Sequence, residues 1–324
     1  MATRYTLRVC ACAIVMTILS CVAHAAPPSV VTCIAPAQPG GGFDLTCRLL
    51  SEALTEAGIS VDRTFMPGGV GAVAFNAVVN QNPDDAATLV AFSEGSIYNL
   101  ALGHYGDRDM EDVRWLAVIA VDYGAVVVRA DAPWQTLPDL LAAVKAEPQR
   151  IALGGGGMIA GQDWMRAATM AQMSGIDMHK MRFVAFEGGG GCIEALVVGF
   201  VQACLNDAGD SQTAIDAGSP IRFVAVHATE RLSGALSSVP TAREQGVALD
   251  WPVLRGVYVG PNVGDEDVRA WTEVLDTVMQ SPRYRELLAD YHLEPMPLTG
   301  PSLQARLSEM AQDARMRAVQ LGVP

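Results

Sequence analysis

Hydrophobic positions follow two alternating patterns along this chain. Short, nearly continuous apolar runs are typical of buried strands, and segments with apolar residues every three to four positions are typical of amphipathic helices. Runs of the first kind predict strands at 30–35, 61–66, 88–92, 150–153, 181–186, 201–205, 222–227 and 254–259. Segments of the second kind predict helices at 44–57, 72–80, 95–102, 137–146, 161–173, 191–198, 211–217, 265–279, 282–290 and 302–320.

One long apolar segment, 115–129, is interrupted at Asp122-Tyr123-Gly124, so it predicts either two strands or one bent strand. The alternation of strands and helices elsewhere predicts an α/β fold with mostly parallel sheets and helices on both faces. No low-complexity linker divides the chain. We therefore expect two lobes joined by crossing strands near 122–129 and 225–245.

Because the chain is expected to cross between the lobes twice, the first lobe should be discontinuous in sequence. We expect it to comprise residues 26–124 and 243–324, with the second lobe formed by 125–242. A ligand cleft is expected between the two lobes, because open α/β folds bind ligands at the carboxyl edges of their strands.

The first 25 residues predict a cleaved secretory signal. Arg4 and Arg8 precede an apolar stretch at 9–22, and Ala-His-Ala at 23–25 fits the cleavage rule. A membrane anchor is the alternative, but the stretch is shorter than the ~20 residues a span needs. A lipoprotein signal ending at Cys21 is a second alternative. We expect cleavage near Ala25 and a periplasmic protein.

Composition excludes several classes of protein. Hydrophobic residues make up 50% of the 324, so the chain can bury a core, which excludes a disordered protein. Collagen and coiled coils are excluded because their repeats are missing. Cleavage would leave 299 residues with 20 Lys and Arg against 35 Asp and Glu, a charge of −15. Without a basic cluster, we expect no nucleic-acid partner.

Four cysteines remain after residue 25, and export exposes them to an oxidising compartment. Three pairings are possible. Local pairing, Cys33 with Cys47 and Cys192 with Cys204, is the interpretation that we favour, because each bond would join a strand to the neighbouring helix. Buried, unpaired thiols are the alternative. No Cys-x-x-Cys occurs and the histidines are scattered, so we expect no metal site.

Four glycine turns repeat along the chain, at 40–42, 68–71, 154–157 and 188–191. Each follows a predicted strand and precedes a predicted helix, so the four turns should meet at the carboxyl edges of the sheets. Helix N-termini present unpaired N–H groups and a partial positive charge, which together bind anions. The turns therefore predict an anion site built without lysine or arginine.

A nucleotide-binding enzyme is the competing hypothesis. Residues 69–74 match the dinucleotide pattern G-x-G-x-x-A between a strand and a helix. Pro67 adjoins the turn, however, and an exported protein meets little nucleotide cofactor. Neither G-x-S-x-G nor H-E-x-x-H occurs. We therefore expect neither an enzyme nor a cofactor.

Several segments resemble a known family, the periplasmic receptors of tripartite tricarboxylate transporters, within the wider Bug-type group of solute-binding proteins. The resemblance lies in CIAPAQPGGGFDLTC at 33–47, MPGGVGAVAFN at 66–76, LVAFSEGSIYNL at 89–100, VAFEGGG at 184–190 and VPTAREQGV at 239–247. It implies a two-lobed, type II periplasmic binding protein fold that closes on an organic acid. It also implies delivery of that acid to membrane permease subunits.

The resemblance further implies which residues hold the ligand's carboxylate, chiefly through backbone groups. Carried over to this chain, they are Gly41, Gly42, Phe43 and Asp44 in the first loop, Gly69, Val70 and Gly71 in the second, Ser93, Gly95 and Ser96 in the third, and Gly156, Gly157, Phe186 and Gly188 in the second lobe. Asp44 also fits the N-cap or first turn of its helix, which is a structural role.

The chain departs from the family where Gly-x-Val-Asp is usual, because it has Gly-Phe-Val-Gln at 199–202. The usual Pro-Asp-Gly turn is Pro-Asp-Asp at 83–85. The resulting hypothesis is a monomeric receptor for a di- or tricarboxylate of the citrate type. A ligand sensor for a membrane kinase would use the same site, so the sequence leaves that alternative open.

Overall fold

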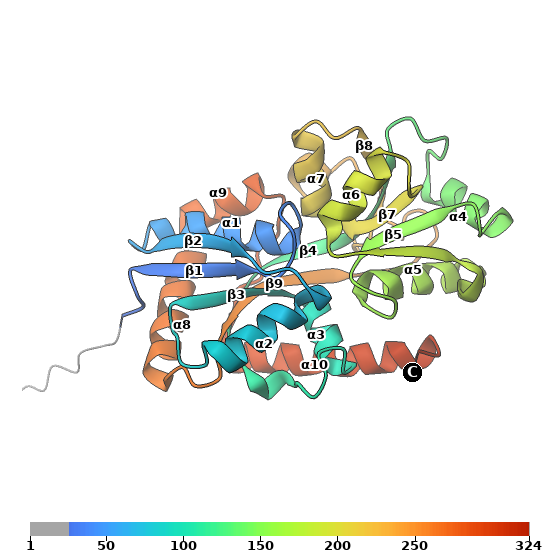
Figure 1. Ribbon diagram of the computed structural model, residues 1–324. Helices are drawn as coiled ribbons and strands as arrows, with labels where there is room; N and C mark the ends of the chain where they lie inside the picture. The colour runs from blue at the N-terminus through green and yellow to red at the C-terminus, as the bar shows by residue number, and fades with distance from the viewer. Residues whose placement is uncertain (1–25, 324) are drawn as a thin grey trace, which may run out of the picture.

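The computed structural model describes residues 26–323 as a mixed α/β protein (Figure 1). The strands are β1 Val30–Ala35, β2 Ser60–Phe65, β3 Thr88–Ser93, β4 Arg114–Arg129, β5 Ala152–Gly156, β6 Arg182–Phe186, β7 Ala203–Asp207, β8 Ile221–Val226, β9 Pro252–Val259 and β10 Leu298–Thr299. The α-helices are α1 Gly42–Thr55, α2 Ala72–Gln81, α3 Glu94–Ala101, α4 Leu137–Ala146, α5 Gln162–Met173, α6 Gly189–Val197, α7 Ala208–Asp216, α8 Asp265–Met279, α9 Pro282–Asp290 and α10 Gly300–Gln320. The predicted signal at 1–25 lies outside the described residues.

The strands pair in the order β2-β1-β3-β9-β4-β7-β5-β6, and β8 and β10 add to β4. Parallel pairing joins β1 to β2 and β3, and β5 to β6 and β7. All pairs made by β4 and β9 are antiparallel, which differs from the predicted mostly parallel sheets. The reason is that β9 and β4 lie between the parallel strands β1–β3 and β5–β7, and each runs opposite to its neighbours.

The long apolar segment forms one strand, β4, and not two. Its residues from Arg114 to Tyr123 pair with β9, and those from Gly124 to Arg129 pair with β7 and β8. Gly124 is the residue at which β4 changes its pairing partner from β9 to β7. A Cβ added there would collide with the side chains of Arg166 and His227. The single strand therefore connects the two sheet regions directly beneath the cleft.

Helices cover both faces of each sheet region (Figure 1). In the β1–β2–β3 region, α1, α8 and α9 share one apolar cluster, and α2, α3 and α10 share another on the opposite face. In the β5–β6–β7 region, α4 and α5 pack on one side and α6 on the other. The C-terminal half of α10, at Ala314 and Ala318, packs into the α4–α5 cluster, so this helix contacts both regions.

The structure pairs the four cysteines locally. Cys33 of β1 bonds to Cys47 of α1, with 5.7 Å between the Cα atoms, and Cys192 of α6 bonds to Cys204 of β7 at 6.1 Å. Each disulfide holds the start of a helix against the strand beside it. These are the helices whose N-termini form much of the site below.

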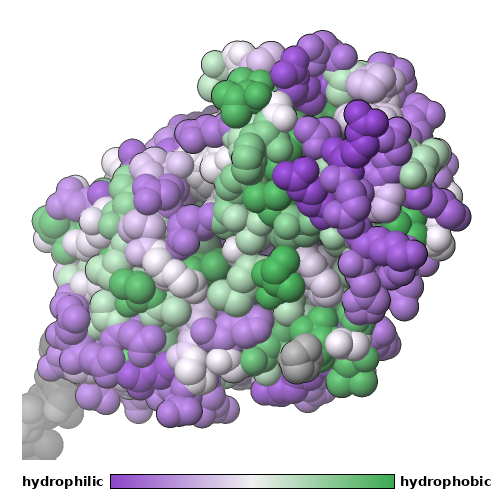
Figure 2. All heavy atoms as spheres, turned by 45° about the vertical axis from the view of Figure 1, so that its right-hand side comes forward, coloured by the Kyte–Doolittle hydropathy of each residue, from purple (hydrophilic) through white to green (hydrophobic). Residues whose placement is uncertain are grey.

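The face shown in Figure 2 is mainly hydrophilic, with patches of hydrophobic side chains between polar ones. Among residues 26–323, the most exposed large hydrophobic side chains are those of Val319, Val198 and Val30, at 79%, 77% and 59%. Among residues 26–323, no helix combines the length and the apolar composition that crossing a membrane requires.

Candidate ligand-binding cleft

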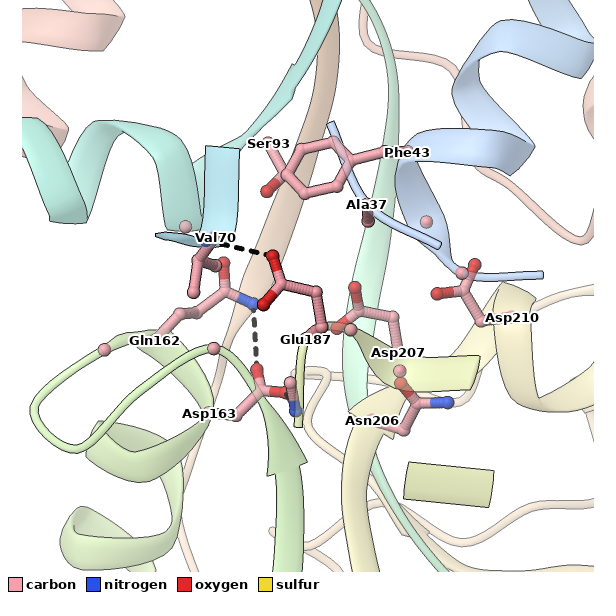
Figure 3. Close-up of a pocket in the computed structure, with 18 of the residues that line it drawn as sticks. Ala37, Phe43, Val70, Ser93, Gln162, Asp163, Glu187, Asn206, Asp207 and Asp210 are labelled. Atoms are coloured by element: carbon pink, nitrogen blue, oxygen red, sulfur yellow. Dashed lines mark hydrogen bonds between the residues drawn. The ribbon is translucent and has the colours of Figure 1, made fainter. Parts of the chain in front are cut away.

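A cavity opens where helix N-termini from the two sheet regions meet (Figure 3). Its lining includes residues from the beginnings of α1, α3, α5, α6 and α7, together with Val70 from the β2–α2 turn. All four glycine turns contribute to it. The cavity has a volume of about 70 Å³. Because one water molecule needs ~10–15 Å³ of such space, this volume suits a small ligand.

Nine of the residues inferred from sequence line this cavity. They are Gly41, Gly42, Phe43, Val70, Ser93, Gly95, Gly156, Gly157 and Gly188. These residues come from both sheet regions, so a ligand in the cavity would touch both at once.

Asp44 does not line the cavity, and its carboxylate is hydrogen-bonded within the first loop and to strand β2. Its Oδ2 accepts a hydrogen bond from the backbone N–H of Gly40 at 3.0 Å, and its Oδ1 accepts one from Arg63 Nη1 at 2.9 Å. The structural role considered for Asp44 from sequence is therefore the one that these contacts support.

Four other inferred residues also lie away from the cavity. The Ser96 hydroxyl accepts a hydrogen bond from the Ser93 N–H at 3.3 Å and so caps α3. Gly71 packs beneath Tyr105, and Gly69 lies in the turn before α2. Phe186 packs against the apolar cluster of α6. These residues shape the loops that carry the lining residues.

Sequence reasoning missed the polar side chains of the cavity. The additional lining residues are Ala37, Asn99, Gly161, Gln162, Asp163, Glu187, Gly189, Asn206, Asp207, Asp210 and Arg255. Some carried a recognisable signal: Asp207 lies just after the predicted strand at 201–205, and Arg255 is the one charge within an apolar run at 252–259. A buried strand tolerates such a charge only when it is paired.

Two buried arginines lie at the cavity: Arg255 is part of its lining, and Arg166 pairs with two of its lining carboxylates. Arg166 bonds to Asp163 at 2.5 Å and to Asp207 at 2.9 Å. Arg255 Nη2 lies 2.6 Å from Asp122, 3.1 Å from Asp207 and 3.5 Å from Asp210. Removing one partner from such a network leaves an uncompensated buried charge, which costs ~3–5 kcal/mol.

Burial raises the pKa of Asp122, Asp163 and Asp210. The pKa of Asp163 rises to about 6 through desolvation, although Arg166 opposes the rise. The pKa of Asp210 rises to about 8 for the same reason, against the effect of Arg255. The network therefore gains or loses protons within the range of ordinary buffers.

Gly42 allows Arg255 to reach the cavity wall. A Cβ built on Gly42 would overlap the Arg255 guanidinium, so only glycine fits at this first position of α1. The guanidinium consequently lies directly against the N-terminus of α1. Gly42 therefore has a steric role in addition to the backbone role that the sequence resemblance implies.

Glu187 reaches across the cavity to the second glycine turn. Its Oε1 accepts hydrogen bonds from the N–H groups of Gly68 at 2.7 Å and Val70 at 3.3 Å. Figure 3 shows the Glu187 carboxylate directed at Val70, with Gln162 and Asp163 beside it. A carboxylate of the protein thus accepts from the N–H of Val70, a residue that the resemblance assigns to the ligand.

The backbone of Val70 is strained where it meets Glu187. Its φ is 55°, in the left-handed region that is unfavourable for a β-branched residue. Such a conformation costs about 1–3 kcal/mol and persists when the surroundings hold it. The Val70 carbonyl accepts a hydrogen bond from Tyr105 Oη at 2.7 Å, and its N–H donates to Glu187. The turn is therefore fixed in advance of binding.

The N-termini of α1 and α6 lack side-chain caps and face each other. Neither Gly41 nor Gly188, the N-cap residues, makes a side-chain cap hydrogen bond. A Cβ built on Gly41 would lie 3.6 Å from the nitrogens of Gly189 and Gly190. Two positive helix ends from different sheet regions thus meet at one place, as an anion site requires.

The chain has the fold of the periplasmic binding proteins, with the cavity between its two sheet regions. The solved periplasmic binding protein BugD has a TM-score of 0.80 at 17% identity, covering 91% of this chain and 98% of its own. Rpa4515 of R. palustris, solved with adipate, has a TM-score of 0.80 at 21% identity over 91% and 98% of the two chains.

Sequence comparison gives the family. Residues 50–321 match the tripartite tricarboxylate transporter family receptor, so the chain belongs to that family. A curated relative from Cupriavidus necator, the UPF0065 protein in the gbd 5′ region, is 23% identical over 258 residues, covering 79% of this chain and 76% of the relative. The protein is therefore a solute-binding receptor and not an enzyme, and receptors of this family are periplasmic.

Proposed function

We propose that this receptor captures a small organic acid between α1 and α6 and delivers it to the membrane permease subunits of a tripartite tricarboxylate transporter. The facing, uncapped N-termini of these helices carry the proposal. They come from different sheet regions, so one carboxylate between them would hold the cleft closed.

Closure would be a movement of two lobes about the crossing strands. We propose lobe limits of 26–124 with 243–324, and 125–242, because β4 changes partners at Gly124. Export through the signal at 1–25, cleaved near Ala25, would place the monomeric receptor in the periplasm.

Affinity in the micromolar range requires about −8 kcal/mol. A few hydrogen bonds from helix N–H groups to a charged carboxylate, at ~1.5–3 kcal/mol each, are sufficient. The relative solved with adipate supports an organic acid as the ligand class.

The carboxylates that line the cavity limit how many negative charges the bound acid can carry. The sequence favours a di- or tricarboxylate of the citrate type, but Glu187, Asp163 and Asp207 already line the cavity with one arginine, Arg255. Asp210 adds little charge near pH 7, because its pKa is raised to about 8. Two like charges 4 Å apart repel by ~4 kcal/mol at an effective dielectric constant of 20. The geometry therefore favours an acid with few negative charges over citrate.

Calorimetry tests this function on the full mature protein. A panel should include citrate, isocitrate, tricarballylate, malate, succinate and adipate, together with amino-substituted acids. We expect heat from at least one compact acid and the weakest response from citrate. The absence of heat from every acid in the panel would contradict the proposal.

A further inference from the structure

The β2–α2 turn is shaped to hold an anion. All four residues from 68 to 71 have positive φ, between 55° and 137°. Successive backbone N–H groups in such a conformation form a concavity that binds anions. The turn leads directly into the N-terminus of α2, which adds partial positive charge. Tyr105 Oη donates to the Val70 carbonyl at 2.7 Å and so holds the concavity in shape.

The protein fills this turn with a carboxylate of its own. Glu187 Oε1 accepts hydrogen bonds from the N–H groups of Gly68 at 2.7 Å and Val70 at 3.3 Å, and Figure 3 draws the second of these bonds. Glu187 itself lies between β6 and Gly188, the N-cap residue of α6. A residue of one sheet region therefore occupies the anion-binding turn of the other.

This contact joins the two ends of the strand order. The order runs β2-β1-β3-β9-β4-β7-β5-β6, so β2, which precedes the turn, and β6, which precedes Glu187, are its outermost strands. The crossing strands β9 and β4 lie in the middle. Opening the cleft about these two strands would move the outer ends apart, so the Glu187 bonds must break. The ion pairs of Arg255 with Asp207 and Asp210, in contrast, start from β9 itself.

We propose that Glu187 is a latch that holds the receptor closed when no ligand is bound. Its carboxylate takes the place of an external anion in the turn at 68–71, and its charge makes both hydrogen bonds stronger than a neutral acceptor would. The inference goes beyond the proposed function, because it concerns the empty receptor and is the same whichever acid binds. A ligand would then enter through transient openings in which the Glu187 bonds are broken.

Small-angle X-ray scattering and hydrogen–deuterium exchange of the dialysed mature protein, with no acid added, test the latch. Glu187→Ala should have a larger radius of gyration than the wild type, because its cleft opens. Amides 68 and 70 should exchange at least about tenfold faster, the factor that one charge-assisted hydrogen bond contributes at its lower limit. Amides 41–45 should also exchange faster. Glu187 makes no hydrogen bond to them within the described chain, so loss of a local contact alone would leave them unchanged.

Two further variants accompany Glu187→Ala. Glu187→Gln keeps the shape of the side chain and removes its charge, so it should give an intermediate result. Glu194→Ala is the matched control, because Glu194 lies on α6 and is exposed, and it should behave as the wild type does.

A Glu187→Ala protein with the radius and exchange of the wild type would overturn the inference. Faster exchange confined to 68–71, with an unchanged radius, would do the same, because Glu187 would then order only its neighbouring turn. A change of equal size in Glu194→Ala would also overturn it. These measurements need no added acid, so the proposed function is tested separately, by calorimetry.

Discussion

Arg255 Nη2 lies 2.6 Å from Asp122 Oδ2, and the pair joins the two central strands, β9 and β4, beneath the cleft. Both residues are buried, at 1% exposure each. The same nitrogen reaches Asp207 and Asp210 at the start of α7. One guanidinium thus connects the crossing strands with the second sheet region and with the wall of the cavity.

Replacing Arg255 should destabilise the fold severely. In Arg255→Met, Asp122, Asp207 and Asp210 would lose their cation while remaining buried, which should cost ~3–5 kcal/mol. Urea denaturation at pH 7 measures the loss. Adding Asp122→Asn and Asp210→Asn to the same chain should restore part of it, because fewer buried charges remain unpaired. Equal stability of Arg255→Met and the wild type would contradict this account.

Gly42→Ala should weaken both ligand binding and folding. The added Cβ overlaps the Arg255 guanidinium, so either the ion pair or the first turn of α1 must shift, at ~1–3 kcal/mol. Thermal unfolding and calorimetry measure the two effects. Gly191→Ala is the control, since a Cβ there meets atoms no closer than 3.6 Å. A Gly42→Ala protein with unchanged affinity would show that the close approach has no functional role.

Stability should fall as the pH rises through neutrality. Burial raises the pKa of Glu94 from 4.5 to about 8, so the folded protein holds a proton there that the unfolded chain has lost. A raised pKa of this kind stabilises the fold fully below pH 4.5 and loses its effect as the pH rises through 8. Asp163 and Asp210 act in the same direction.

Thermal unfolding at pH 5 and pH 9 tests the role of Glu94. Glu94→Gln removes the titrating group, so the drop in Tm between the two pH values should shrink by ~5 °C or more. The exposed Glu56→Gln should leave the drop unchanged. An identical drop in wild type and Glu94→Gln would show that the carboxyl group of Glu94 titrates normally.

The disulfide between Cys192 and Cys204 should contribute substantially to stability. It closes a loop with a sequence separation of 12, for which chain entropy predicts ~3 kcal/mol. The double replacement Cys192→Ala with Cys204→Ala should lower the free energy of unfolding by about that amount. Reduction should have a comparable effect in a variant whose Cys33 and Cys47 are already replaced by alanine, because only the Cys192–Cys204 bond is then left to break. A loss below ~0.5 kcal/mol would contradict the expected contribution.

Local sequence patterns predicted most of the secondary structure. The run at 30–35 is β1, and the helical spacing after Gly42 gives α1, which begins two residues before the predicted start. The mixed pairing of the sheets was harder to predict. Strand β9 returns between β3 and β4, and no periodicity within 252–259 reveals that neighbour.

The candidate site, like the fold, was predictable from sequence only in part. The glycine turns marked the loops that meet at the cavity, because a glycine before a helix is a local signal. The partners of Arg255 lie 45 to 133 positions away, and Glu187 is separated from Gly68 by 119. Contacts over such separations arise only after folding, so the acidic character of the cleft was not visible in sequence.

Hydrogen–deuterium exchange tests the central claim most directly, namely that an organic acid closes the cleft between α1 and α6. Exchange should be followed with and without the best-binding acid, on amides 41–45 and 188–192. We predict that both segments become protected together, because one carboxylate engages both helix N-termini. Protection of one segment alone, or protection confined to other parts of the chain, would contradict the account.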